Sequence, residues 1–371
     1  MKGIALFIIL FFFTGCEPWV DIFEDDISEE VIMFESSEAN ENVVPNFDSL
    51  KVVTWNIRNG LARFPWALES CGDSVISNRA SIEVNLIKIA EKLDDMDADI
   101  VLLQEIDFLS KRSAYINQIQ FLLDNTNLNF GAYASMLKTD FAPFYGLGMV
   151  DGGNAILSKY KLEDAQRIPL SLRTDQSSVE LYFWLRRNIL NVKIPDLFQD
   201  GKEFYAVNIH ATAFATDNTK QKHMNEFIEV LDEINSAGDF FVAGGDLNSV
   251  PPGSEIDFCE ADKCEGDVCD GDYKNNSAYH GHFFGHFEGE PDLLVPFYNS
   301  YNAAIDLSEA NLPTHFTHAP STSFEKDSVK FDRKLDYLFT NSDWQNGQTH
   351  QESWLLSDHT AVSATFKLTA D

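Results

Sequence analysis

The sequence predicts an α/β protein whose strands are buried and whose helices are amphipathic. Short runs of apolar or β-branched residues, such as 100–103 and 240–243, are typical of strands buried on both faces. The segment 218–236 instead repeats its apolar residues with the period of a helix and leads into one of these strands. The chain has 371 residues, 44% of them hydrophobic, which is enough for one large core or two modest ones.

The N-terminus begins with a basic residue and a short apolar run. Lys2 precedes an apolar run of about ten residues, whereas a membrane-spanning helix needs roughly 20. The sequence Phe13-Thr14-Gly15-Cys16 then resembles a lipobox, although lipoproteins usually have Leu in place of Phe13. The resemblance implies that residues 1–15 are a signal peptide and that Cys16 is lipidated. The protein would then be anchored to a membrane outside the cytoplasm, on the periplasmic face or the cell surface.

Residues 16–48 are predicted to be an acidic tether, because they contain acidic clusters and lack a sustained helical or strand period. The whole chain has 27 basic and 59 acidic residues and a formal net charge of −32. Its averaged field therefore repels nucleic acid and anionic membrane surfaces. A polyanionic substrate would need a local basic patch or a bound metal ion.

The cysteines are consistent with disulfide bonds. Of the 5 cysteines, those other than Cys16 are Cys71, Cys259, Cys264 and Cys269. An exported protein meets an oxidising compartment, so two disulfides in any of three pairings fit these residues. The spacing of the last three does not match a zinc site.

From Leu50 onward the chain begins as strand, helix, strand. Residues 51–57 are rich in β-branched and aromatic residues, and the predicted strand delivers Asn56 near its end. Ser77-Asn78 can cap a helix with an apolar stripe. Residues 99–105 then form a second buried strand that ends in the carboxylate of Glu105.

The middle of the chain continues with a helix and further strands. A second helix is predicted to follow Ser113, and short strands are predicted at 154–158 and 189–194. Residues 203–210 alternate well enough for a strand, with His210 at its exit.

A clear amphipathic helix at 218–236 precedes the strand 240–246. A glycine pair and two prolines end this strand abruptly, where Asp246 and Asn248 emerge. Asp and Asn favour turns in any protein, but side by side at a strand's carboxyl end they can also hold a water, a hydroxyl or a hard cation.

Regular periodicity fades between 253 and 310, which predicts a long loop or insertion at about 253–310. Residues 334–339 are a predicted strand that contains Asp336. Residues 361–368 form the last predicted strand, and Asp358-His359 precede it.

Polar side chains thus recur at the ends of predicted strands. One at a time, such residues are more often caps, turn residues or structural histidines. Together they supply hard oxygen ligands for Mg²⁺, a group that activates water, and a histidine paired with a carboxylate. These are the parts needed for metal-assisted hydrolysis of a phosphoester.

These residues lie in motifs that resemble the endonuclease/exonuclease/phosphatase superfamily, which includes deoxyribonuclease I and neutral sphingomyelinases. The motifs occur in the superfamily's order and are Thr54-Trp55-Asn56-Ile57, Leu103-Gln104-Glu105, Asn208-Ile209-His210, Gly245-Asp246-Leu247-Asn248, Lys334-Leu335-Asp336-Tyr337 and Ser357-Asp358-His359. The resemblance implies a two-layer sandwich of mixed β-sheets flanked by helices, formed by one domain at 49–371. It also implies Mg²⁺-dependent hydrolysis, with Mn²⁺ as an alternative cofactor.

The resemblance also implies a metal site. Glu105 would be the principal Mg²⁺ ligand, with Asn56 beside it. Asp358 would complete the metal or phosphate contacts. Hard oxygens of this kind suit Mg²⁺, which is bound in proteins through few carboxylates.

The remaining motif residues would act on the phosphate and the water. Asp246 would position and activate the attacking water, and Asn248 would donate its amide to the phosphate. His359, oriented by Asp336, would bind a non-bridging oxygen or act in proton transfer. His210 would contact the phosphate, as in the deoxyribonuclease-like branch.

Two arginines are predicted to contact the substrate phosphate. Arg58 stands where some repair enzymes of the superfamily have an aspartate, and this departure favours a cationic phosphate contact. Arg187 would supply another contact, or else form a structural pair with Arg186.

The expected substrate is a phosphodiester of a lipid headgroup or a small molecule, which fits the anchor and the acidic surface. A secreted-type nuclease acting on DNA or RNA is the alternative, and it fits His210 and the superfamily's commonest activity. An inactive binding protein with the same fold is a third interpretation, but none of the catalytic residues is missing. No obligate protein partner is expected.

Overall fold

The structure is a computed structural model that describes residues 19–23, 31–40, 49–67, 71–198, 201–213, 215–254, 258, 261, 263, 290–320 and 328–367. The predicted signal peptide and lipidation site Cys16 lie outside these residues, as do Cys259, Cys264 and Cys269. Cys71 is disulfide-bonded, and its partner is outside the described residues. None of the helices in the described parts of the chain has the length and apolar character needed to span a membrane.

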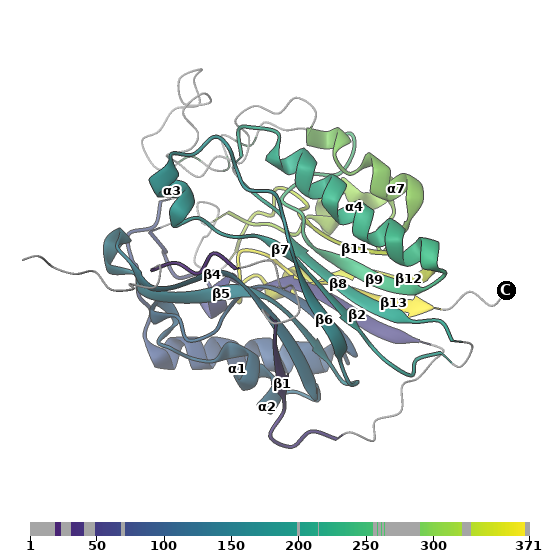
Figure 1. Ribbon diagram of the computed structural model, residues 1–371, viewed down its shortest axis with the longest axis horizontal. Coiled ribbons are helices and arrows are strands. Elements are labelled where there is room, and N and C mark those ends of the chain that lie inside the picture. Colours follow the sequence, from purple (N-terminus) through teal and green to yellow (C-terminus); the bar gives the residue numbers. More distant parts are fainter. Residues whose placement is uncertain are drawn as a thin grey trace, which may run out of the picture.

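Two β-sheets form the centre of the molecule (Figure 1). The seven-stranded sheet has the order β1 (Val31–Glu35), β4 (Phe130–Ala142), β5 (Gly148–Ser158), β3 (Ile100–Asp107), β2 (Leu50–Asn56), β13 (Val362–Lys367) and β12 (Asp343–Thr349). The six-stranded sheet has the order β10 (Asn302–Ala303), β11 (Asp336–Thr340), β9 (Phe240–Asp246), β8 (Phe204–His210), β7 (Asn188–Lys193) and β6 (Glu163–Pro169). Both sheets are mixed, because β2 pairs with β3 and β8 with β9 in parallel while the other pairs are antiparallel.

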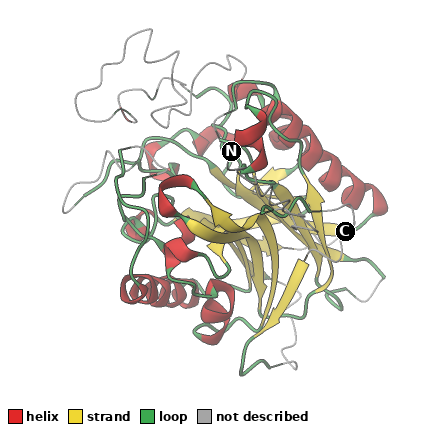
Figure 2. Ribbon diagram, turned by 60° about the vertical axis from the view of Figure 1, so that its left-hand side comes forward, coloured by secondary structure: helices red, strands yellow, loops and turns green. Residues whose placement is uncertain are grey.

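Helices cover the outer faces of the two sheets (Figures 1 and 2). The seven-stranded sheet carries α1 (Arg79–Asp95) and α2 (Gln118–Asp124), and the six-stranded sheet carries α4 (Thr219–Ala237) and α7 (Val295–Ser300). Two shorter helices are α3 (Ser178–Tyr182) and α8 (Leu307–Ala310). The predicted two-layer sandwich with helices outside is therefore confirmed.

Alternating strand residues build three apolar layers. On β2, Val52 packs between the sheets, whereas Trp55 faces the layer under α1 and α2. On β9, Val242 packs between the sheets, whereas Phe241 faces the layer under α4 and α7. The parallel strands are buried on both faces, which explains their continuous apolar sequences.

Most predicted elements are present, but the second helix begins at a later residue than the sequence predicts. Asn78 caps α1 as expected, with its side chain accepting a hydrogen bond from the Ser81 amide over 3.0 Å. The second helix begins later than Ser113, because Asn117 is the residue that caps it. Gly238 ends α4 in the left-handed conformation, as its position after the helix predicts.

The prediction that residues 16–48 are a tether is wrong for the described parts of that segment. Residues 31–35 form β1 at the edge of the seven-stranded sheet, in register with β4 from Val31 opposite Ala134. Val20 also forms a β-bridge with Thr139. The charge-rich composition concealed a short apolar run, in which Phe34 packs on the core under α1 and α2.

The predicted insertion at 253–310 is also too long. Residues 290–310 belong to the fold, because Phe297 of α7 is fully buried under α4 and β10 pairs with β11. Most of 255–289 lies outside the described residues.

Candidate active site

The topology brings the predicted site residues to one edge of the sandwich. In the parallel pairs, Asn56 of β2 is level with Gln104 of β3, and His210 of β8 is level with Asp246 of β9. Asp336 begins the antiparallel strand β11, so it lies opposite Asp246. The segment 357–359 precedes β13, which runs antiparallel to β2, and therefore arrives at the same edge.

Two fully buried amides join the sheets just inside this edge. Gln104 Nε2 donates to Asn208 Oδ1 over 2.7 Å. Asn208 Nδ2 in turn donates to the carbonyls of Leu103 and Ala155 at 2.8 and 2.9 Å. This link fixes β8 against β3, so the residues that follow on each strand face one another.

Glu105 is aimed into the site by a β-bulge. The pairing of β3 with β5 shifts between Leu103 and Ile106, and Glu105 has a φ of +50°, which is unfavourable for a residue with a Cβ atom. Asn56 Nδ2 lies 3.1 Å from Glu105 Oε1, and Asn59 Nδ2 lies 3.1 Å from Oε2. Strain of this kind is often found at functional sites.

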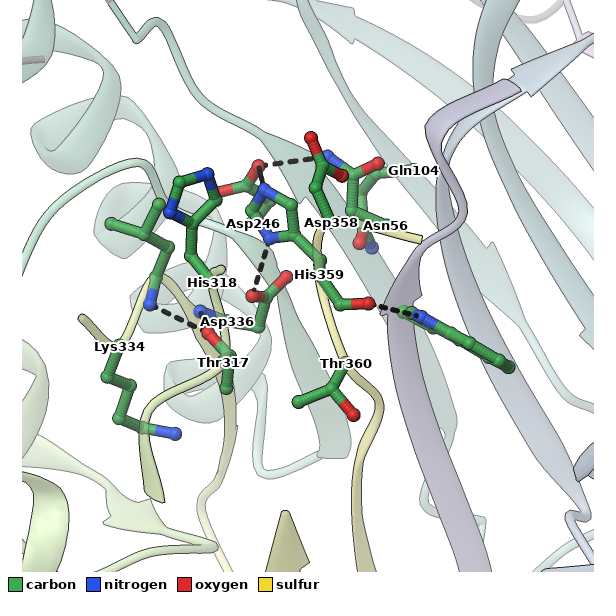
Figure 3. Close-up of polar contacts among 12 residues, drawn as sticks. Asn56, Gln104, Asp246, Thr317, His318, Lys334, Asp336, Asp358, His359 and Thr360 are labelled. Atoms are coloured by element: carbon green, nitrogen blue, oxygen red, sulfur yellow. Dashed lines mark hydrogen bonds and ion pairs between the residues drawn. The ribbon is translucent and has the colours of Figure 1, made fainter. Parts of the chain in front are cut away.

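Asp246 connects the carboxylate of Glu105 to two histidines. Asn56 Nδ2 also donates to Asp246 Oδ2 over 3.1 Å. The same oxygen lies 3.4 Å from His210 Nε2 and 3.8 Å from His359 Nε2. His359 Nδ1 is 2.8 Å from Asp336 Oδ2, and the imidazole ring of His359 points toward Asp246 in Figure 3.

The two histidines are driven into opposite protonation states. Burial, together with nearby Arg187, lowers the pKa of His210 well below its ordinary value. Burial would also lower the pKa of His359, but the charges of Asp336 and Asp246 outweigh it and raise that pKa well above its ordinary value. Near neutral pH, His210 is therefore neutral and His359 is an imidazolium.

The pKa of Asp246 lies near neutral pH. Burial raises the pKa of its carboxyl group to about 7, and the charge of Asp336 acts in the same direction while that of His359 opposes it. A carboxylate with a pKa near the operating pH is well suited to act as a general base.

Asp358 precedes His359 in the chain and is paired with Arg58. Arg58 Nε is 3.3 Å from Asp358 Oδ2. Burial would raise the pKa of Asp358, but the guanidinium of Arg58 lowers it to about 2. Arg58 also donates to the Ala62 carbonyl over 2.6 Å and is only 1% exposed, so the structure places it as a buried partner of Asp358.

Arg187 and Asn248 complete the edge. Arg187 Nη1 donates to the His210 carbonyl over 3.1 Å, and burial lowers the pKa of this arginine to about 10. Within the described parts of the chain, its buried Nε has no hydrogen-bond partner. Asn248 donates its backbone N–H to Asp246 Oδ1 over 2.9 Å and its side-chain amide to the Ala211 carbonyl over 3.0 Å.

The sequence did not identify Asn59 or His318 as site residues. Asn59 contacts Glu105, and the His318 ring lies 5.0 Å from that of His359. The side chain of His318 is also 3.3 Å from Asp332, which orients the ring. Their roles depend on the way loops pack together, and no spacing in the sequence signals that.

The donor set fits a hard divalent cation. Both oxygens of Glu105 accept from neutral amides, and its side chain is 27% exposed, so solvent can reach it. Asp336 Oδ1 is buried and has no hydrogen-bond partner among the residues that the structure describes. The ligand atoms of Asp246, Asp336 and His359 lie within 4.8 Å of one another, as do those of His318, Asp358 and His359. Carboxylate oxygens suit Mg²⁺ and Mn²⁺.

Comparisons with known proteins agree with this architecture. The model of the Endonuclease/Exonuclease/phosphatase family matches residues 53–359. An endonuclease/exonuclease/phosphatase from Beutenbergia cavernae DSM 12333 is 16% identical with a TM-score of 0.54, and the alignment covers 87% of this chain and 72% of that chain. One from Bacteroides vulgatus is 18% identical with a TM-score of 0.51, over 86% of this chain and 99% of that chain. At these identities the structures show a common fold, and no curated protein matched the chain.

Proposed function

This chain belongs to the endonuclease/exonuclease/phosphatase family, and we propose that it hydrolyses a phosphodiester with the help of Mg²⁺. The family generally consists of metal-dependent hydrolases. One observation carries the proposal: carboxylates, an amide and two histidines from distant strands form a continuous network at one edge. That network joins Glu105, Asn56, Asp246, His210, His359 and Asp336.

Glu105 and Asn56 would hold the metal ion, which when bound would neutralise charge on the phosphoryl oxygens. Asp246 accepts a proton from the attacking water, a role that its pKa of about 7 supports. As the water oxygen bonds to phosphorus, the bond from phosphorus to the leaving oxygen breaks. The proton that Asp246 accepted then returns through solvent to the leaving oxygen, which departs as an alcohol. His359 remains protonated under the influence of Asp336, so it donates a hydrogen bond to the phosphoryl group.

Neutral His210 and the buried guanidinium of Arg187 both interact with Asp246. They would bind the remaining phosphoryl oxygens, with His210 held in place by the bond from Arg187 to its carbonyl. The amide of Asn248 would add a further donor. Arg58 acts indirectly, because its guanidinium lowers the pKa of Asp358 and so keeps that carboxylate ionised beside the site.

The substrate we propose is a small or lipid-derived phosphodiester, and we place the protein outside the cytoplasm, anchored to a membrane at Cys16. The net charge of −32 disfavours a long polyanion such as nucleic acid. No obligate protein partner is needed, since one chain supplies the whole network.

The test is hydrolysis of bis(p-nitrophenyl) phosphate with Mg²⁺ and with a chelator. We expect Asp246→Asn to lower kcat by at least a hundredfold, because the base is lost while its volume is kept. The matched control is Asp164→Asn, an exposed carboxylate paired only with Lys193 among the described residues. Wild-type turnover in Asp246→Asn, or turnover that the chelator does not affect, would overturn the proposal.

A panel of substrates separates the alternatives. Release of phosphorylated headgroups from sphingomyelin or phosphoinositide vesicles, with little plasmid nicking, is the expected pattern. Cleavage of DNA or RNA without headgroup release would instead identify a nuclease. A protein that hydrolyses none of them, although it folds and binds Mg²⁺, would be an inactive binding protein.

A further inference from the structure

Large apolar side chains are exposed together at one corner of the molecule. Trp19 is 59% exposed, and Phe141, Phe144, Tyr145 and Val179 are exposed by 42–73%. We call these five residues the apolar rim. Single exposed apolar residues are ordinary, but a contiguous group indicates an interaction surface.

The rim is contiguous although its parts are distant in sequence. The rings of Trp19 and Phe141 are 6.1 Å apart. The ring of Phe144 is 5.4 Å from that of Phe183, which follows α3 and the rim residue Val179. The backbone N–H of Val20 lies 3.3 Å from the hydroxyl of Tyr182, and this contact joins the first segment to α3.

The rim lies at the same edge as the active site. Asp107 lies two residues after Glu105 on β3 and pairs with Gly152 of β5. From that pair the β4–β5 hairpin extends beyond the end of β3 to its tip at 143–147. Lys111 Nζ bonds the Gly146 carbonyl at this tip over 2.9 Å. The segment that carries α3 joins β6 to β7. The first residues of β7 lie beside the end of β8, where His210 is located. In Figure 1, α3 is accordingly on the left, away from the arrowhead of β13.

The segment 19–23, which contains Trp19, is fixed to this corner. Thr139 Oγ1 donates to the Trp19 carbonyl over 2.6 Å, and the Asp21 amide donates to the Lys138 carbonyl over 2.9 Å. Lys138 Nζ also pairs with the Asp21 carboxylate at 3.3 Å. Cys16 precedes Trp19 by only three residues, which span at most about 10 Å.

We propose that the apolar rim docks on a phospholipid bilayer and turns the active-site edge toward the lipid headgroups. This inference rests on the proposed acylation of Cys16 and deepens the proposed hydrolysis by assigning it a membrane-embedded substrate. Acyl chains on Cys16 would hold Trp19 within about 10 Å of the bilayer surface. Trp, Tyr and Phe are the side chains that favour the membrane interface. The bilayer we expect is zwitterionic, because the net charge of −32 opposes an anionic surface.

Docking is tested with the mature, acylated protein in phosphatidylcholine vesicles whose acyl chains carry bromine, which quenches nearby tryptophan. The difference in fluorescence between wild type and Trp19→Phe isolates Trp19. We expect brominated lipid to quench Trp19 at least twofold. Mass spectrometry first verifies acylation of Cys16. An acylated, vesicle-bound protein whose Trp19 is not quenched would overturn the proposal, and concentration-dependent self-association through the rim would then point to a second copy.

Activity separates docking from chemistry. Phe141→Ser with Tyr145→Ser should leave turnover of bis(p-nitrophenyl) phosphate unchanged and lower turnover of a vesicle-embedded phosphodiester at least tenfold. The matched control is Val84→Ser with Ile87→Ser, which removes exposed apolar side chains from α1. Equal loss in rim and control variants, or no loss in the rim variant, contradicts docking. Absence of soluble turnover in wild type refutes the proposed function, whereas quenching of Trp19 still supports docking.

Discussion

The substitution Asp336→Asn isolates the charge that keeps His359 protonated. The two side chains meet at 2.8 Å and are at most 6% exposed. Asparagine keeps the volume and can still accept from Nδ1, but the negative charge is lost. Removing one charge from a buried pair costs about 3 kcal/mol or more, which corresponds to about a hundredfold loss in kcat if the pair acts in the transition state.

The pH profile gives the sign of this effect. Asp336 raises the pKa of His359, so the protonated, active form persists above neutral pH. In Asp336→Asn that pKa falls, and the alkaline limb of kcat moves to lower pH. The assay is hydrolysis of bis(p-nitrophenyl) phosphate from pH 5 to 10, with Asp164→Asn as the control and melting temperatures to verify folding.

A double-mutant cycle with His359→Gln completes the test. If Asp336 acts through His359, the double variant loses no more activity than His359→Gln alone, within about threefold. Losses that multiply would refute the coupling. So would an Asp336→Asn enzyme with the kcat and pH profile of the wild type.

Three further predictions concern the framework. Asp107→Asn should lower the free energy of unfolding by about 3–5 kcal/mol in urea, because Arg112 Nη2 pairs with the buried carboxylate at 2.7 Å; an unchanged midpoint would contradict this. Gly245→Ala should unfold the protein in a thermal-shift assay, since a Cβ would lie 1.9 Å from the Ile209 carbonyl and φ is +140°; a native melting temperature would show otherwise. Burial lowers the pKa of His223 to about 4, so as the pH falls the unfolded state binds a proton at this residue before the folded state does. The free energy of unfolding should therefore fall by about 3 kcal/mol between pH 6.5 and 4. The variant His223→Gln should reduce this loss.

Sequence patterns predicted the elements that carry continuous apolar runs. The strands that carry Asn56, Glu105, His210 and Asp246 are buried on both faces, so their local sequences suffice to define them. The long strand β4 was missed because its Gly and Ala residues give neither alternation nor an apolar run. The edge strand β1 was missed for a different reason, since acidic neighbours dominate the segment around it.

The site was predictable as a set of residues but not as a set of contacts. Motif order identified Asn56, Glu105, Asp246 and His359, and the structure joins them in one network. The link between Gln104 and Asn208 arises only when two sheets pack together, so no single strand shows it. The pairing of Arg58 with Asp358, in place of an exposed phosphate contact, likewise depends on loops that meet in three dimensions.

The most direct test of the central claim is the binding of Mn²⁺, followed by electron paramagnetic resonance. Wild-type protein should bind Mn²⁺ in competition with Mg²⁺. Glu105→Gln should weaken this binding at least tenfold and lower phosphodiester turnover in parallel, while Glu163→Gln, at the half-buried start of β6, changes neither. A Glu105→Gln protein that binds Mn²⁺ and hydrolyses the diester as the wild type does would contradict the account.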